Sequence, residues 1–150
     1  MSKMMVFDEQ GSQPPKLVTD QSQMTAVLGA HGVRFEQWSC PRALTENATS
    51  EEIIDAYRDQ VDRLMRESGF QSADVISLHP EHPDKDTLRE KFLHEHTHMD
   101  DEVRFFVDGE GLFYLHFDEV VYGVLCEKGD LISVPAKTKH WFDMGPAPSF

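Results

Sequence analysis

The feature that most constrains this chain is a series of short apolar segments in its last third, separated by turn residues at regular intervals. Each segment is long enough for one strand only, and Asp-Gly or Gly-Asp pairs between them are typical of hairpin connections. The predicted strands cover 92–98, 103–107, 112–117, 120–127, 131–135 and 140–143. Short strands at this even spacing predict a mainly β, antiparallel sandwich or barrel.

The first half of the chain predicts helices with a few extended segments. A possible capping box at Asp20 starts a short helix, and a second one at Thr49 starts a longer helix over 50–68, which ends before Gly69. Further extended segments are predicted at 4–7, 16–18, 33–38 and 74–79. We expect a single domain over 1–150, in which residues 1–73 pack on the strands of 74–150.

The charge balance excludes several classes of partner. The chain has 14 Lys and Arg residues against 27 Asp and Glu residues, a formal charge of −13. Binding of nucleic acid or of an anionic membrane requires clustered basic residues, so we expect neither. The apolar positions before Asp8 are too few for the core of a signal peptide, and no apolar run reaches the ~18–20 residues of a membrane span, so we expect a cytoplasmic protein. We also expect a monomer, with Cys40 and Cys126 as reduced thiols.

Histidines gather in one segment, where His94, His96 and His98 alternate with other residues. On a strand these three side chains point to the same side, so two imidazoles can meet one ion. Glu102 follows shortly after, and His140 comes 38 residues later. Imidazoles with a carboxylate and no thiolate favour a first-row dication such as Fe(II), Ni(II), Co(II) or Mn(II). The same histidines could instead lie on a solvated strand face, and the residues alone leave both readings open.

The spacing of these residues resembles the two cupin motifs. His96-x-His98, Glu102 and then Gly109 resemble the first motif, and Gly129, Pro135 and His140 resemble the second. The sequence departs from the pattern in two places. Lys137 stands where many cupins have Gly, and Met144 stands where many have Asn.

Longer segments resemble the acireductone dioxygenase family more closely. They are Glu95-His-Thr-His98, Asp101-Glu-Val-Arg-Phe-Phe-Val107, Gly111-Leu-Phe-Tyr-Leu-His116, Cys126-Glu-Lys-Gly-Asp-Leu-Ile-Ser-Val-Pro135 and His140-Trp-Phe-Asp-Met-Gly-Pro146. The resemblance implies a cupin-type antiparallel β-barrel, also called a double-stranded β-helix or jelly roll, with the N-terminal helices packed outside. The family usually continues beyond the position of Phe150, so we expect this chain to be short at its C-terminus.

The resemblance also implies a metal centre and a reaction. It assigns one Fe(II) or Ni(II) ion per chain to His96, His98, Glu102 and His140. The implied substrates are O2 and an acireductone of methionine salvage, 1,2-dihydroxy-3-keto-5-methylthiopentene. With Fe(II) the implied products are 4-methylthio-2-oxobutanoate and formate, and with Ni(II) they are methylthiopropionate, formate and carbon monoxide. The residues do not choose between the two metals, because one ligand set can hold either ion.

Two charged residues near these ligands are candidate catalytic groups. Arg104 lies two residues beyond Glu102, so on a strand it faces the same side and could hold a developing oxyanion of the substrate. An outward ion pair is the alternative for Arg104. Asp101 could accept a proton from the substrate hydroxyl or hold a ligand imidazole. We interpret His94 as a residue at the rim of the pocket or as a histidine that is hydrogen-bonded by its neighbours.

Apolar residues around the ligands give candidate substrate contacts, which are Phe92, Phe106 and Phe142. They could line the methylthio tail of the substrate or simply belong to the barrel core. Two other functions also remain open from the sequence. One is a cupin module that binds a metal or small ligand without turnover, and the other is a cupin enzyme that acts on a different enediol.

Overall fold

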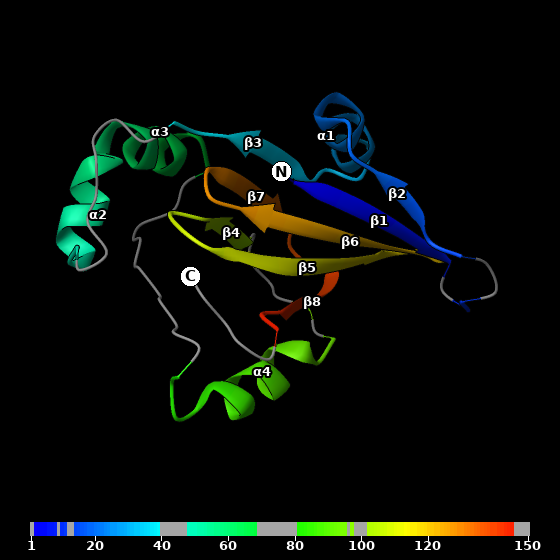
Figure 1. Cartoon of the computed structure of the whole chain (residues 1–150). Helices are drawn as coiled ribbons and strands as arrows, with labels where there is room; N and C mark the ends of the chain where they lie inside the picture. Colours follow the sequence, from blue (N-terminus) through cyan, green and yellow to red (C-terminus); the bar gives the residue numbers. More distant parts are fainter. Residues whose placement is uncertain are drawn as a thin grey trace. The chain divides into compact units, whose positions relative to one another are not determined.

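The computed structural model describes residues 2–8, 10–11, 14–39, 48–68, 81–95, 97 and 102–145. The chain divides into two compact units, one formed by Met1–Trp38 with Leu78–Phe150 and the other by Ser39–Ser77 (Figure 1). The first unit contains all of the described strands, and the second contains two helices. The single domain expected over 1–150 stays a prediction.

The first unit is built from two antiparallel sheets. In the larger sheet the strand order is β2-β1-β6-β5-β8, and in the smaller it is β3-β7-β4 (Figure 1). The strands of the larger sheet are β1 (Lys3–Asp8), β2 (Lys16–Val18), β5 (Glu110–Phe117), β6 (Val120–Glu127) and β8 (Lys139–Asp143). The strands of the smaller sheet are β3 (Arg34–Gln37), β4 (Glu102–Phe105) and β7 (Asp130–Val134). The mainly β, antiparallel class predicted from strand spacing is confirmed.

The core lies between the inner faces of these two sheets. Period-two alternation buries Phe113 and Leu115 on β5, whereas β7 is buried along nearly its whole length, including Ile132 and Val134. All four belong to one apolar cluster, so side chains of both sheets share a single core. Burial of such side chains contributes roughly 1.5–3 kcal/mol each, which is the main force that holds the sheets together.

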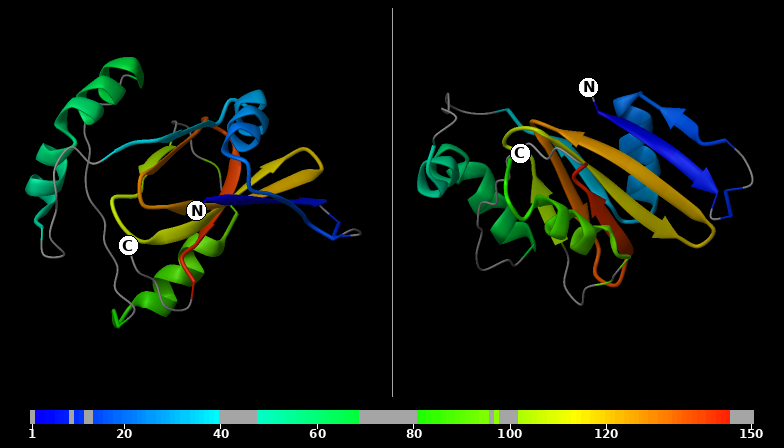
Figure 2. Two further views of the ribbon diagram at one scale, coloured as in Figure 1. Left: turned by 45° about the horizontal axis from the view of Figure 1, so that its top comes forward. Right: turned by 60° about the horizontal axis from the view of Figure 1, so that its bottom comes forward.

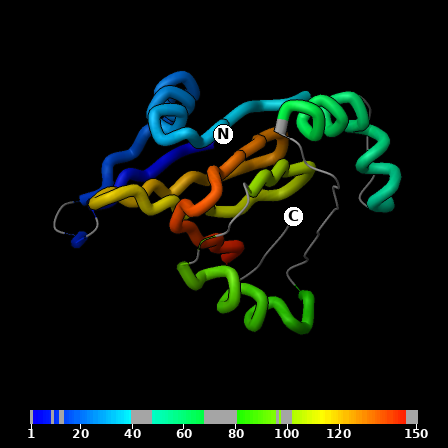
Figure 3. The backbone as a smooth tube through the Cα atoms, turned by 180° about the vertical axis from the view of Figure 1, so that it is seen from behind, coloured from blue at the N-terminus to red at the C-terminus, as the bar shows by residue number. Residues whose placement is uncertain are grey.

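Helix α1 (Gln21–Ala30) adds Met24 and Leu28 to this core. The helix begins as predicted, because the side chain of Asp20 accepts a hydrogen bond of 3.0 Å from the backbone N–H of Gln23. It packs beside β3 (Figure 3). The apolar face of α1 thus belongs to the same core as the two sheets.

The strand predicted over 92–98 is wrong for the residues there that the structure describes. Phe92 and Leu93 end helix α4 (Lys85–Leu93), and His94 caps it with extended backbone. Leu88 and Phe92 are four residues apart, as one helix face requires, and strong helix formers surround them. Helix α4 packs against β8 (Figure 2). Residue preference allows a helix here, and the packing of α4 on β8 decides for it over the strand that alternation predicted.

The second unit contains α2 (Ser50–Ala56) and α3 (Arg58–Ser68) where one helix was predicted. The interruption is confined to Tyr57, whose backbone leaves the helical region while its carbonyl still accepts from the N–H of Val61 at 2.8 Å. The predicted start is confirmed. The hydroxyl of Thr49 accepts a hydrogen bond of 3.2 Å from the backbone N–H of Glu52.

Other sequence predictions have mixed outcomes. Cys126 is a free, fully buried thiol, and burial together with the charge of Asp130 raises its pKa. Cys40, Gly69 and the strand predicted over 74–79 lie outside the described residues. In the part of the chain that the structure describes, no helix is long and apolar enough to cross a bilayer.

Candidate metal centre

Two of the four candidate ligands, Glu102 and His140, lie in described strands at the edges of the two sheets. Glu102 begins β4, where it pairs with Val134 of β7, and His140 lies on β8, where it pairs with Leu115 of β5. Their side chains meet across the core, with 2.7 Å between Nε2 of His140 and Oε2 of Glu102. Residues 38 positions apart in the sequence therefore share one site. The other two candidates, His96 and His98, lie outside the described residues.

The orientation of the His140 ring is fixed by the backbone of its own strand. His140 is 2% exposed, and its Nδ1 lies 2.8 Å from the carbonyl oxygen of Thr138, to which it donates. This hydrogen bond directs Nε2 toward Glu102 and selects the tautomer whose Nε2 lone pair is available to a metal.

The same contacts govern the protonation of His140. Burial lowers the pKa of the imidazole, and the positive charge of Arg104 acts in the same direction. The contacts with Glu102 and Thr138 outweigh both, so the net pKa of His140 is raised. A cation that binds Nε2 of His140 must therefore compete with a proton for that atom.

Arg104 holds the second oxygen of Glu102. One guanidinium nitrogen of Arg104 lies 2.9 Å from Oε1 of Glu102, and another donates to the carbonyl oxygen of Val103 at 3.2 Å. The two side chains share one side of β4, as residues two apart on a strand do. Arg104 is half-exposed and Glu102 is mostly buried, so the arginine lies between the carboxylate and solvent.

This donor pair fits a metal ion. Two ligand atoms at about 2.1 Å from an ion and at right angles to each other are about 3.0 Å apart. The observed 2.7 Å between Nε2 and Oε2 is close to that separation. Among the described residues no three His, Cys, Asp or Glu side chains form a metal-binding group, and two of the four expected ligands lie outside that part of the chain.

The three candidate pocket residues belong to one aromatic cluster. The ring of Phe142 lies 6.4 Å from those of Phe92 and Phe106, centroid to centroid, and 4.7 Å from that of Phe113, which sequence reasoning missed. Phe106 is buried, whereas Phe92 and Phe142 are half-buried. Gly111 makes room for this cluster, since a Cβ there would lie closer than 3.0 Å to the ring of Phe142.

The remaining candidates lie at the margin of the site or outside the described residues. His94 is exposed at the end of α4, and Asp101 is not among the described residues. Sequence reasoning also missed His116, whose Nδ1 lies 2.8 Å from Oε2 of Glu95. Glu95 and His116 both lie in segments that resemble the acireductone dioxygenase family, but the sequence gave no indication that their side chains meet.

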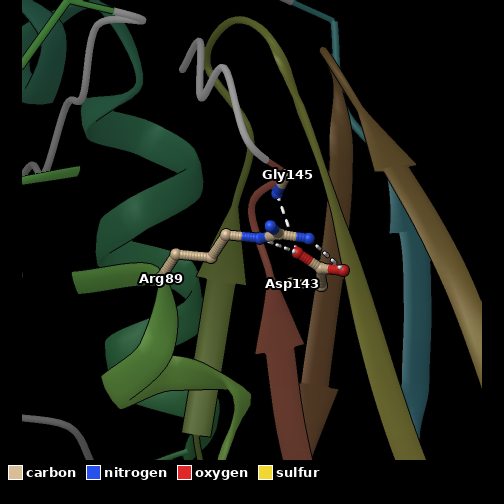
Figure 4. Close-up of polar contacts among 3 residues, drawn as sticks. All are labelled: Arg89, Asp143 and Gly145. Carbon is tan, nitrogen blue, oxygen red and sulfur yellow. Dashed lines mark hydrogen bonds and ion pairs between the residues drawn. The ribbon is translucent and has the colours of Figure 1, made fainter. Parts of the chain in front are cut away.

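An ion pair between α4 and β8 was also missed. Nε of Arg89 lies 3.0 Å from one carboxylate oxygen of Asp143, and a terminal nitrogen lies 3.4 Å from the other (Figure 4). The backbone N–H of Gly145 donates to the same carboxylate at 2.8 Å. Burial alone would raise the pKa of Asp143, but these hydrogen bonds and the charge of Arg89 lower it overall.

A buried imidazole and a carboxylate that meet between two antiparallel sheets define the class as a cupin-type β domain with mixed nitrogen and oxygen donors for a metal. Comparison with known proteins then identifies the group within this class. The ARD/ARD′ family matches residues 3–150, and the chain belongs to this family.

Curated relatives and a solved structure agree with this assignment. The chain is 56% identical to an acireductone dioxygenase of Marinobacter nauticus, over 100% of this chain and 81% of the relative. It is 51% identical to an acireductone dioxygenase of Alcanivorax borkumensis, over 99% of this chain and 83% of the relative. Its structure resembles that of an acireductone dioxygenase from Bacillus anthracis with a cadmium ion in the active centre. The TM-score is 0.84 and the identity 32%, over 95% of this chain and 85% of that one. The family resemblance and the cupin-type fold predicted from the sequence are confirmed.

Proposed function

We propose that this chain is a metal-dependent acireductone dioxygenase of methionine salvage. The observation that carries the proposal is the buried contact of 2.7 Å between His140 and Glu102, which provides two adjacent metal donors in a family of this activity. Relatives named acireductone dioxygenase are 51% to 56% identical across nearly the whole chain, which supports the same reaction here.

The proposed ligands of one Fe(II) or Ni(II) ion are His96, His98, Glu102 and His140. The spacing of the His140 and Glu102 donors supports this assignment, and so does the His140 tautomer set by Thr138. When bound, the metal would supply a Lewis acid for the oxygens of an ionised enediol. The chain already orients Glu102 and His140 toward each other, so these two side chains need little reorganisation when the ion binds.

Arg104 is proposed to act on the charge of the substrate. It already neutralises Glu102 at 2.9 Å, and its half-exposed guanidinium has further N–H donors that can reach an enediolate oxygen at the same side of β4. Asp101 is proposed to accept the proton of a substrate hydroxyl, or to hold a ligand imidazole. Either role would follow from its place next to Glu102 in the sequence.

The aromatic cluster is proposed to accept the methylthio tail of the substrate. Phe92 and Phe142 are half-buried and meet at 6.4 Å, which leaves part of each ring available to an apolar group. Phe106 is buried behind them. Thioethers make favourable contacts with aromatic rings, so the cluster favours this tail over a polar one.

We propose that the bound metal selects the products, with Fe(II) giving 4-methylthio-2-oxobutanoate and formate, and Ni(II) giving methylthiopropionate, formate and carbon monoxide. We further propose that the protein acts in the cytoplasm as a monomer. The formal charge of −13 supports the absence of a nucleic-acid or membrane partner and disfavours self-association.

The test is product analysis of the metal-loaded protein. Protein loaded with Fe(II) is mixed anaerobically with the acireductone, O2 is added, and formate and the 2-keto acid are quantified. Both products should form well above the uncatalysed rate, and a His140→Ala variant treated identically should show only that rate. Bound Fe(II) without substrate consumption would refute the dioxygenase and leave a metal-binding module.

A further inference from the structure

The segment that contains the first two proposed ligands is attached to β5 by a contact outside the metal centre. Nδ1 of His116 lies 2.8 Å from Oε2 of Glu95, and Glu95 directly precedes His96 in the chain. The two residues are 21 positions apart, so this contact is tertiary. The side chain of His116 is only 15% exposed, which partly shields the contact from solvent.

The strand register places this contact on a defined face of the sheet. Leu115 pairs with His140, and His116 pairs with Lys139. Because side chains alternate along a strand, the inward direction of Leu115 and His140 turns His116 to the opposite face. Glu95 is therefore held on the outer side of β5 by His116, which directly follows Leu115, the strand partner of His140.

We propose that His116 is a positioning residue of the metal centre, which acts by holding Glu95 and thereby the backbone immediately before His96. This inference rests on the proposed ligand set. The contact with His116 restrains the backbone of Glu95, and Glu95 is bonded directly to the first proposed ligand in the chain. A residue that orients ligands in this way raises metal affinity without touching the ion.

A second contact lies earlier in the chain, on the helix that leads into this segment. Arg89 on α4 binds Asp143 at the end of β8, about one helical turn before α4 ends at Leu93 (Figure 4). Glu102 at the far end of the segment is fixed in β4. The described residues on both sides of the two proposed histidine ligands are therefore held by tertiary contacts.

The surroundings of His116 make it a practical position for substitution. It borders an open hollow of about 330 Å³ that is also lined by Phe117, Asp118 and the segment Lys137–Lys139. A smaller or differently shaped side chain at 116 is therefore accommodated without displacing the core, in which Leu115 is fully buried. Loss of the contact can thus be separated from loss of the fold.

The experiment measures Ni(II) affinity of the metal-free full chain in competition with a chelator. His116→Leu and Glu95→Ala should each weaken Ni(II) binding by roughly 10–100-fold, the range for loss of a group that orients metal ligands. The double variant should bind no more weakly than the weaker single variant, because both changes remove the same contact. His116→Asn places an N–H donor near the position of Nδ1 and should restore most of the affinity.

The matched control is His31→Leu. His31 is also a partly buried histidine, with its Nε2 at 3.2 Å from the hydroxyl of Tyr122 and its ring stacked on Phe117, but it contacts no proposed ligand segment. This control should lower the melting temperature of the metal-free protein while leaving Ni(II) affinity within about twofold. Circular dichroism of every metal-free variant checks the fold.

Three results would overturn the inference. Ni(II) affinity of His116→Leu within twofold of the unsubstituted chain would show that the contact does not position the ligands. Additive losses in the double variant would show that His116 and Glu95 act independently. An unsubstituted chain that binds no Ni(II) would refute the proposed metal centre itself, and this inference with it.

Discussion

Gly111 provides a sharp test of the packing around the proposed substrate pocket. Its Cβ, if present, would lie closer than 3.0 Å to two ring carbons of Phe142 and 3.4 Å from one of Phe106. Ordinary carbon contacts are about 3.5–4.0 Å, so in Gly111→Ala the ring of Phe142 must move by at least about 0.5 Å. That ring is confined by Phe113 at 4.7 Å between centroids. The substitution therefore forces overpacking instead of a free displacement.

The expected cost follows from this confinement. Overpacking of a closely packed core costs about 1–3 kcal/mol in the free energy of unfolding. For a chain of 150 residues each kcal/mol lowers the melting temperature by about 2–4 °C, so Gly111→Ala should melt about 2–12 °C lower. Phe142→Leu in the same background removes the obstructing ring carbons and should recover part of the loss, as coupled neighbours do.

Thermal unfolding followed by circular dichroism measures this effect. The matched control is Gly29→Ala, because Gly29 lies within α1 and a Cβ there meets nothing within 4 Å. Alanine favours a helix over glycine by up to about 1 kcal/mol, so the control should melt at the same temperature or higher. A melting temperature of Gly111→Ala within 1 °C of the unsubstituted protein would refute the packing described around Phe142.

Three further predictions concern the metal centre and its supports. His140→Ala should reduce the Ni(II) affinity measured by calorimetry more than about 100-fold, since a ligand is lost. Full Ni(II) occupancy in this variant would refute the assignment of His140 as a ligand. Arg89→Met should lower the melting temperature at pH 7 but not near pH 2. Because folding lowers the pKa of Asp143, its ion pair with Arg89 stabilises the fold fully above the ordinary aspartate pKa of about 4. This stabilisation is lost as the pH falls through the lowered pKa. An equal loss at both pH values would contradict it. Arg104→Met should reduce kcat about 10²–10³-fold with metal content unchanged, whereas parallel loss of metal would show that Arg104 serves Glu102 alone.

Much of the secondary structure could be predicted because its causes are local. The hydroxyl of Thr49 and the carboxylate of Asp20 cap helices at the predicted positions, and both caps depend on residues three positions away. The hairpin of β5 and β6 follows from alternating apolar residues on either side of a short turn. The strand predicted at 92–98 was wrong because Phe92 fits a helix face with Leu88 as well as it fits an alternating strand, and packing of α4 on β8 decides between them.

The candidate metal centre was also predictable only in part. The residue types of His140 and Glu102 indicated a metal with nitrogen and oxygen donors, and the motif spacing indicated the family, which comparison confirmed. The contacts of His116 with Glu95 and of Arg89 with Asp143 had no signal in the sequence, since each joins residues from different elements without any periodic pattern.

The sequence by itself therefore determined the local elements, the donor chemistry and the family of this protein, because caps, alternation and motif spacing act over a few residues. Only the tertiary structure decided which donors meet and what holds them. The separation of 2.7 Å between His140 and Glu102 arises from the packing of two sheets, whose register is set by all their strands together. Contacts of that kind depend on the burial of a shared core, and no short stretch of sequence contains that information.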